Sequence, residues 1–256
     1  MPAIHHSALD GYSAKADTYV KGRPDYPPEI DVWLRNDLGL NGNKTVLDLG
    51  AGTGKFSARL LAIGATTIAV EPVPAMLNQL MQLYPNIEAK EGSAKRIPLA
   101  DASVDAVVCA QAFHWFANSE ALGEIHRVLK PGGSLGLVWN VRDERRKWVA
   151  ALTKIIEPFE GDAPRYHTQQ WRRLFPADGF SPLRENHFSN EHTGSPEQVI
   201  IDRILSISFI AALPFDRQQH VESRIRKLIA TSPELAEKTV VTFPYETAVF
   251  SCRKLC

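Results

Sequence analysis

Short apolar runs alternate with amphipathic segments along residues 44–141. The runs at 45–49, 67–71, 87–91, 104–110 and 134–139 have the length and apolar character of buried strands. Between them, residues 55–63, 73–83 and 119–129 carry apolar side chains at helical spacing. Strands that alternate with helices indicate a parallel sheet covered on both faces. The pattern therefore predicts an α/β fold with a Rossmann-like, doubly wound sheet.

The pattern changes after Asn140. Residues 142–180 are rich in Arg, Trp and Phe and show no strand alternation, which predicts a helical lid insertion over the carboxyl edge of the sheet. Strands are expected at 183–192 and 239–252, and helices at 196–207 and 216–230. Neither an internal repeat nor a low-complexity linker is present, so we expect one domain over residues 1–256.

The loop Gly-Ala-Gly-Thr-Gly at 50–54 joins the first strand to the first helix, a position where open α/β sheets bind ligands. A phosphate-binding P-loop requires glycine where Leu49 stands and a hydroxyl where Phe56 stands, so that interpretation fails. A dinucleotide fingerprint requires glycine at Lys55, whereas the third glycine comes one residue early at Gly54. A third interpretation, the methyltransferase loop, places an acid two positions before the glycines.

Asp48 supplies that acid. A carboxylate here would repel a pyrophosphate but can accept a hydrogen bond from the ammonium group of a methionine moiety. Glu71 ends the second strand, 23 residues after Asp48, and an acid there can accept both ribose hydroxyls of an adenosine. NAD enzymes use the same device, so Glu71 indicates adenosine binding without selecting the cofactor.

Further motifs follow the loop in order. They are Val-Leu-Asp-Leu-Gly-Ala-Gly-Thr-Gly (46–54), Ala-Val-Glu-Pro-Val-Pro-Ala-Met (69–76), Glu-Gly-Ser-Ala (91–94), Asp-Ala-Val-Val-Cys-Ala-Gln-Ala (105–112) and Leu-Lys-Pro-Gly-Gly (129–133). Together they resemble the successive motifs of class I S-adenosylmethionine-dependent methyltransferases of the type 11 domain, over about residues 15–141. Ala-Gln-Ala-Phe-His-Trp-Phe (110–116) and Arg-Pro-Asp-Tyr-Pro (23–27) are similar to the small-molecule enzymes grouped with trans-aconitate and fungal thiol methyltransferases.

The resemblance implies a seven-stranded sheet whose last strand is antiparallel. It also implies four parts: an N-terminal helical cover (1–43), a cofactor-binding core (44–141), the lid insertion (142–180), and C-terminal strands and helices (181–256). The cofactor implied by the resemblance is S-adenosyl-L-methionine. Its methionine portion would be held by Asp48, Gly50 and Gly52, its ribose by Glu71, and its adenine would lie near Pro72, Met76, Ser93 and Ala94. Gln111 would lie near the reacting centre, and Tyr19 or Arg23 would reach the carboxylate of the cofactor. Many relatives carry an acid where this chain has Ser93, and a serine makes the weaker hydrogen bond to the adenine amino group.

Methyl transfer is an in-line displacement, so the main tasks of such a protein are positioning and exclusion of water. His114 is the candidate catalytic residue, either as a general base or as a side chain that orients its loop. Trp115, Trp139 and Asn140 are candidates for the substrate pocket, although packing is an equal explanation for the tryptophans.

Composition narrows the function classes. Lys plus Arg and Asp plus Glu both number 29, which gives no electrostatic footprint for nucleic acid or an anionic membrane. The three cysteines, Cys109, Cys252 and Cys256, lack the partners of a zinc site, so no metal is expected. No signal peptide or membrane span is recognised, which favours a cytoplasmic protein with reduced thiols, monomeric or homodimeric.

The sequence thus predicts methyl transfer to an O or S atom of a small-molecule acceptor. Two alternatives stay open. One is a protein of the same fold that binds the cofactor without transferring methyl groups, as a pericyclase or a regulatory module. The other is a tRNA or protein methyltransferase.

Overall fold

The computed structural model describes residues 23–255, and its centre is one seven-stranded sheet in the order β3-β2-β1-β4-β5-β7-β6. The strands are β1 (Thr45–Leu49), β2 (Thr66–Glu71), β3 (Glu88–Glu91), β4 (Val104–Ala110), β5 (Leu129–Arg142), β6 (Arg184–Gly194) and β7 (Val241–Arg253). Pairing is parallel from β3 through β5, and β7 pairs antiparallel with both β5 and β6. The predicted fold, with its last strand antiparallel, is confirmed.

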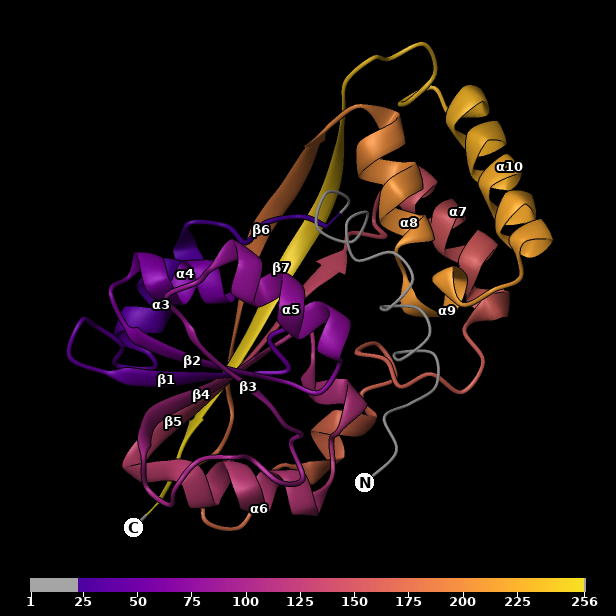
Figure 1. Ribbon diagram of the computed structural model, residues 1–256. Helices are drawn as coiled ribbons and strands as arrows, with labels where there is room; N and C mark the ends of the chain where they lie inside the picture. The colour runs from indigo at the N-terminus through magenta and orange to yellow at the C-terminus, as the bar shows by residue number, and fades with distance from the viewer. Residues whose placement is uncertain (1–22, 256) are drawn as a thin grey trace.

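Helices cover both faces of this sheet (Figure 1). On one face, α3 (Glu29–Asn36) and α4 (Ser57–Ala62) pack against apolar side chains of β1, β4 and β5, and α5 (Pro74–Leu83) packs beside β2. On the other face, α6 (Ser119–Val128) packs with Trp171 and Phe180 against the opposite side chains of the strands. The strands β1, β2 and β4 bury both of their faces, which explains why they read as continuous apolar runs, whereas the edge strands β3 and β6 are mostly exposed or half-buried.

A separate helical layer lies at the far end of the long β6–β7 pair, at the upper right of Figure 1. Its elements are α7 (Lys147–Ile156), the π-helical turn η4 (Glu197–Asp202), α8 (Arg203–Leu205), α9 (Ser208–Ala211) and α10 (Phe215–Thr231). Together with the first half of β7 they form one buried apolar cluster. The predicted lid therefore contributes α7 to this layer and Trp171 to the sheet face, while the proposed boundary at residue 180 stays a prediction. Within residues 23–255, no helix is both long and apolar enough to cross a membrane.

Two predicted elements differ from the structure. The strand expected at 134–139 begins at Leu129, because that residue already pairs with Val104 across an irregular register, and it continues to Arg142. The helix expected at 196–207 forms as the π-helical turn η4 followed by α8, which ends at Leu205, and the extended backbone of Ile207 (φ −70°, ψ 131°) separates it from the further helix α9. The remaining predicted helices and strands are confirmed to within a few residues.

Candidate active site

The glycine loop after β1 is fixed to the end of β2. The N–H groups of Gly50 and Ala51 both donate to the carbonyl oxygen of Val70, at 2.8 and 3.2 Å. Gly50 has φ +74°, and a Cβ atom there would lie 2.7 Å from the Cβ of Ala112. Glycine is thus required at this position both for the backbone conformation and for the close approach of the segment that follows β4.

Glu71 stabilises the glycine loop through two hydrogen bonds to backbone N–H groups. Its Oε2 accepts the N–H of Gly52 at 2.9 Å, and its Oε1 accepts the N–H of Val73 at 2.9 Å. The side chain is almost fully buried, and this burial raises the pKa of Glu71 to about 7, although both N–H groups oppose the shift. The carboxyl group therefore shapes the loop and faces the adjoining cavity.

A first cavity lies above β1, β2 and β4, at the carboxyl edge where the strand order reverses. It brings together most of the predicted site residues, namely Arg23, Gly50, Gly52, Glu71, Pro72, Met76, Ser93, Ala94, Gln111, Trp115 and Asn140. Gln111 is held with φ +58°, an uncommon backbone conformation for a residue with a side chain, and its N–H donates to the oxygen of Val138 at 2.8 Å. The predicted Tyr19 lies outside the described residues.

Asp48 is not among the residues that line this cavity. Its side chain alternates onto the same face as Val46, which α4 covers, and its Oδ2 accepts the hydroxyl of Ser57 at 2.6 Å. Burial raises the pKa of Asp48 to about 6, and its Oδ1 has no hydrogen-bond partner in the described part of the chain. The structure thus places this acid beneath the loop, and its predicted contact with the methionine portion stays a prediction.

A second cavity adjoins the first. It is lined by Arg23, Gln111, His114, Trp139, Asn140, Val141, Arg142, Glu144, Arg165, Tyr166, His167, Arg203, Ile207 and Ser208. Four of these residues, Arg23, Gln111, Asn140 and Arg203, also line the first cavity and form a shared wall. His114 and Trp139 face only the second cavity, so the predicted site residues divide between two connected spaces.

The hydrogen bond between Trp139 and His114 determines what the imidazole can do. The indole Nε1–H of Trp139, which can only donate, lies 3.0 Å from Nδ1 of His114. Neutral His114 therefore carries its proton on Nε2. Burial, together with the nearby charges of Arg165 and Arg23, lowers the pKa of His114 to about 3. Of the two interpretations of this residue, the geometry favours an oriented hydrogen-bond donor over a general base.

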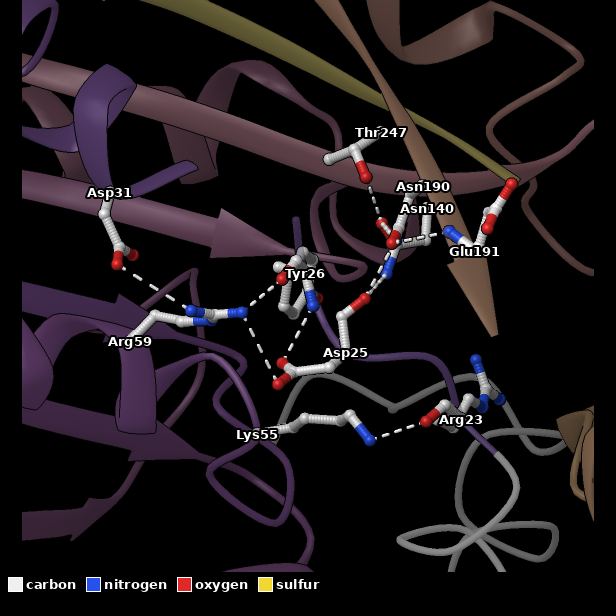
Figure 2. Close-up of polar contacts among 10 residues, drawn as sticks. All are labelled: Arg23, Asp25, Tyr26, Asp31, Lys55, Arg59, Asn140, Asn190, Glu191 and Thr247. Carbon is white, nitrogen blue, oxygen red and sulfur yellow. Dashed lines mark hydrogen bonds and ion pairs between the residues drawn. The ribbon is translucent and has the colours of Figure 1, made fainter. Parts of the chain in front are cut away.

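Residues 23–26 cross the carboxyl edge of the sheet and are tied down along their length (Figure 2). Lys55 donates to the carbonyl oxygen of Arg23 at 2.6 Å, and Arg59 donates to the oxygen of Tyr26. The side-chain amides of Asn140 and Asn190 both donate to the oxygen of residue 25, at 3.2 and 2.9 Å. These contacts fix the backbone of residues 23–26, and the Arg23 side chain, which is part of the shared wall, donates to the carbonyl oxygen of Ser206 at 3.3 Å.

The asparagine amides form a small network of their own. Oδ1 of Asn140 accepts from Asn190 at 3.1 Å and from the hydroxyl of Thr247 at 2.6 Å. Three strands, β5, β6 and β7, therefore meet at one amide group beside the cavities. The geometry gives Asn140 an anchoring role in addition to the pocket-lining role that was predicted for it.

Asp48 and Glu71 are expected to contribute stability to the ligand-free protein that is lost as the pH rises from about 4 to about 7. Their pKa values are about 6 and about 7 in the folded protein, against 3.8 and 4.5 for the free side chains, so folded molecules hold protons that unfolded chains have released. His114, whose pKa falls from 6.5 to about 3, contributes in the opposite direction over part of this range. The free energy of unfolding, measured by urea denaturation at several pH values, should therefore fall less, or rise more, across this range for Glu71→Gln than for the wild type, and the same pH dependence in both proteins would contradict the expectation.

Arg23 was predicted as a site residue, but the sequence did not identify the other three arginines of the second cavity. Arg142 ends β5, Arg165 lies between α7 and Trp171, and Arg203 begins α8. One signal was present, since Arg203 is a lone cation beside the apolar residues 199–201 and 204 of a predicted helix. The sequence around Arg142 and Arg165 gives no comparable signal, because these residues come together only in the folded protein.

The sheet order, the glycine loop after β1 and the acid at the end of β2 define a class I methyltransferase domain. Residues 47–137 match the family model described as a methyltransferase domain. The uncharacterized methyltransferase-like protein C25B8.10 of Schizosaccharomyces pombe is 40% identical over 96% of each chain, and the uncharacterized methyltransferase Rv3342 of Mycobacterium tuberculosis is 40% identical over 92% of each chain. The chain belongs to this family of methyltransferases.

Solved structures agree on the fold. The YcgJ protein of Bacillus subtilis superposes with a TM-score of 0.57 at 18% identity, covering 89% of this chain and 99% of that one. A phosphoethanolamine N-methyltransferase of Haemonchus contortus in complex with S-adenosyl-L-methionine superposes with a TM-score of 0.57 at 13% identity, covering 98% of this chain and 59% of that one. At these identities the comparison speaks to the fold alone.

Proposed function

We propose that this protein uses S-adenosyl-L-methionine to methylate an O or S atom of a small-molecule acceptor. The observation that carries the proposal is the arrangement of the two cavities: one is floored by the glycine loop and Glu71, and it meets the other across Arg23, Gln111, Asn140 and Arg203. A donor and an acceptor bound in the two spaces would meet at the shared wall, where reacting groups can be aligned.

The residues of the first cavity fit the cofactor. Each carboxylate oxygen of Glu71 accepts one backbone N–H and retains a lone pair for a ribose hydroxyl. Pro72, Met76 and Ala94 offer apolar surface for an adenine, and the glycines allow close approach. The cofactor complex of the Haemonchus contortus protein, which shares the fold, supports the same assignment. When bound, S-adenosylmethionine supplies an activated sulfonium methyl group.

The state of His114 bears on the acceptor atom. With Nδ1 occupied by Trp139 and a pKa of about 3, this imidazole is a poor acceptor of a proton from the substrate. An acceptor that ionises in water without help, such as a carboxylic acid or a thiol, suits such a cavity. The Nε2–H of His114 would then donate a hydrogen bond to the acceptor and help to position it.

Calorimetry with S-adenosylhomocysteine and a methyl-transfer assay with labelled cofactor test the proposal. We expect binding in the micromolar range, and transfer to at least one member of a panel of carboxylates and thiols. A protein that binds no cofactor would refute the proposal. Cofactor binding without transfer to any acceptor would instead favour a regulatory or pericyclic role, and labelling of tRNA or protein would identify a macromolecular substrate.

A further inference from the structure

The second cavity is strongly cationic. Arg23, Arg142, Arg165 and Arg203 all line it, together with His167, whereas Glu144 is the one acidic side chain among its lining residues in the described part of the chain. Glu160, close by, pairs with Arg165 at 3.3 Å and with His167 at 3.5 Å. The charge of Arg165 is therefore partly compensated, whereas no acidic side chain pairs with Arg142 or Arg203 among residues 23–255.

Arg203 is buried without an acid beside it. Its side chain is 7% exposed, it forms no ion pair within residues 23–255, and its Nε and Nη1 atoms have no hydrogen-bond partner there. Burial lowers the pKa of Arg203 to about 9, and the positive charges of Arg23 and Arg142 act in the same direction. A buried guanidinium group with unsatisfied N–H donors is costly unless an anion accepts them.

Arg142 is a partly buried cation that also lines the second cavity without an acidic partner among the described residues. Its Nε has no hydrogen-bond partner among them. Burial lowers the pKa of Arg142. The charges of Glu144 and Glu160 raise this pKa, and the charge of Arg23 lowers it. Glu144 directs Oε1 to the hydroxyl of Thr153 at 2.8 Å. Arg142 lines the second cavity only, so its charge faces the acceptor side rather than the cofactor side.

Other donors point to the same ligand chemistry. The hydroxyl oxygen of Ser208 is buried and has no hydrogen-bond partner within residues 23–255, and Nε2 of His114 carries a hydrogen that is not used by Trp139. The same cavity is also lined by the apolar or aromatic side chains of Trp139, Val141, Tyr166 and Ile207. Donors combined with apolar and aromatic lining suit a small molecule that has an anionic group on an apolar body.

Resting on the function proposed above, we infer that the methyl acceptor is an organic anion, and that Arg142 and Arg203 hold its carboxylate or phosphate group in the second cavity. Planar guanidinium groups bind either anion through paired hydrogen bonds. Arg203 also faces the first cavity, so it can in addition meet the carboxylate of the cofactor. A substitution of Arg142 can distinguish binding of the acceptor from binding of the cofactor, because Arg142 does not line the first cavity.

The experiment compares matched pairs of charged and uncharged probes. Phenylacetate is titrated against phenylacetamide, succinate against succinamide, and phenyl phosphate against phenol, with protein saturated by S-adenosylhomocysteine. We expect at least one charged member to bind about 10- to 100-fold more tightly than its neutral partner. The pair that shows the preference tells whether a carboxylate or a phosphate is recognised.

Two variants locate the binding group. Arg142→Gln should abolish the preference for the charged probe and leave the affinity for S-adenosylhomocysteine unchanged. Arg145→Gln is the matched control, because Arg145 lies three residues away, is exposed and pairs with Asp143 at 2.7 Å. The Arg145→Gln variant should keep the preference for the charged probe. Far-UV circular dichroism confirms that both variants are folded.

The inference is overturned if no charged probe binds better than its neutral partner, or if Arg142→Gln keeps the preference. It is also overturned if Arg142→Gln weakens the cofactor as much as the probe, because the cations would then serve the cofactor alone. Failure of the proposed function looks different, since S-adenosylhomocysteine itself would not bind. The same titrations on ligand-free protein then still test whether the cavity selects anions.

Discussion

Replacing Glu71 with alanine is expected to weaken cofactor binding by about 10- to 100-fold, the cost of losing hydrogen bonds to a charged group. The substitution removes the acceptor for the N–H groups of Gly52 and Val73 as well as the carboxylate that faces the cavity. The loop loses its support and the proposed ribose contact at the same time. Calorimetric titration with S-adenosylhomocysteine measures the change.

Glu91→Ala is the matched control for this prediction. Glu91 ends β3, directly beside Glu71 in the parallel register, yet it is exposed and does not line the cavity. Its removal should leave the affinity unchanged. Equal affinities of Glu71→Ala and the wild type would show that the cofactor does not use this carboxylate. Glu71→Gln should lie between the two, because one amide oxygen can replace only one of the two acceptors.

The largest effect on stability is expected from Trp171→Ala, which should lower the free energy of unfolding by about 3–5 kcal/mol. Trp171 is 2% exposed, and its ring lies 4.6 Å from that of Trp139 and 4.9 Å from that of Phe250, measured between centroids. Its indole N–H donates to the oxygen of Tyr166 at 3.2 Å. Alanine would remove these ring contacts and one of the hydrogen bonds to that carbonyl oxygen, which keeps the backbone and side-chain N–H groups of Gln169 as donors.

Chemical denaturation measures this loss of stability, and two further variants serve as comparisons. Trp171→Phe keeps most of the apolar volume and should cost clearly less than alanine. Arg173→Ala, two residues away and exposed, should change stability by no more than about 0.5 kcal/mol. A small effect of Trp171→Ala would mean that the segment 166–175 does not contribute to the core of the sheet. Because Trp171 supports Trp139, and Trp139 orients His114, the variant should also weaken acceptor binding more than cofactor binding.

The core of the fold could be predicted because its signals are local. The apolar runs of β1, β2 and β4 and the helical spacing between them need no knowledge of distant residues. The start of β5 at Leu129 was missed because Pro131 and two glycines read as a turn, and only pairing with β4 extends the strand through them. The end of the helix near Ile207 agrees with the sequence, but the short helix α9 that follows was not predicted.

The candidate site also contains some residues that the sequence could predict and others that it could not. The glycine loop and Glu71 are recognisable because their spacing in the sequence fixes their meeting at the sheet edge. The direction of Asp48 follows from strand alternation and could have been predicted once α4 was placed on the face of Val46. The arginine cluster could not, because Arg142 and Arg203 lie 61 residues apart and converge only when the helical layer packs beside the end of β5.

The division of the two cavities between parts of the chain has an evolutionary and practical consequence. The first cavity, proposed for the cofactor, is built mainly from residues 49–118, whereas the walls unique to the second cavity, proposed for the acceptor, come largely from residues 139–208. Under this proposal, relatives can differ in substrate through changes in the later segment while they keep the same cofactor cavity. A protein engineer can follow the same route, by grafting that segment from one relative onto the first half of another.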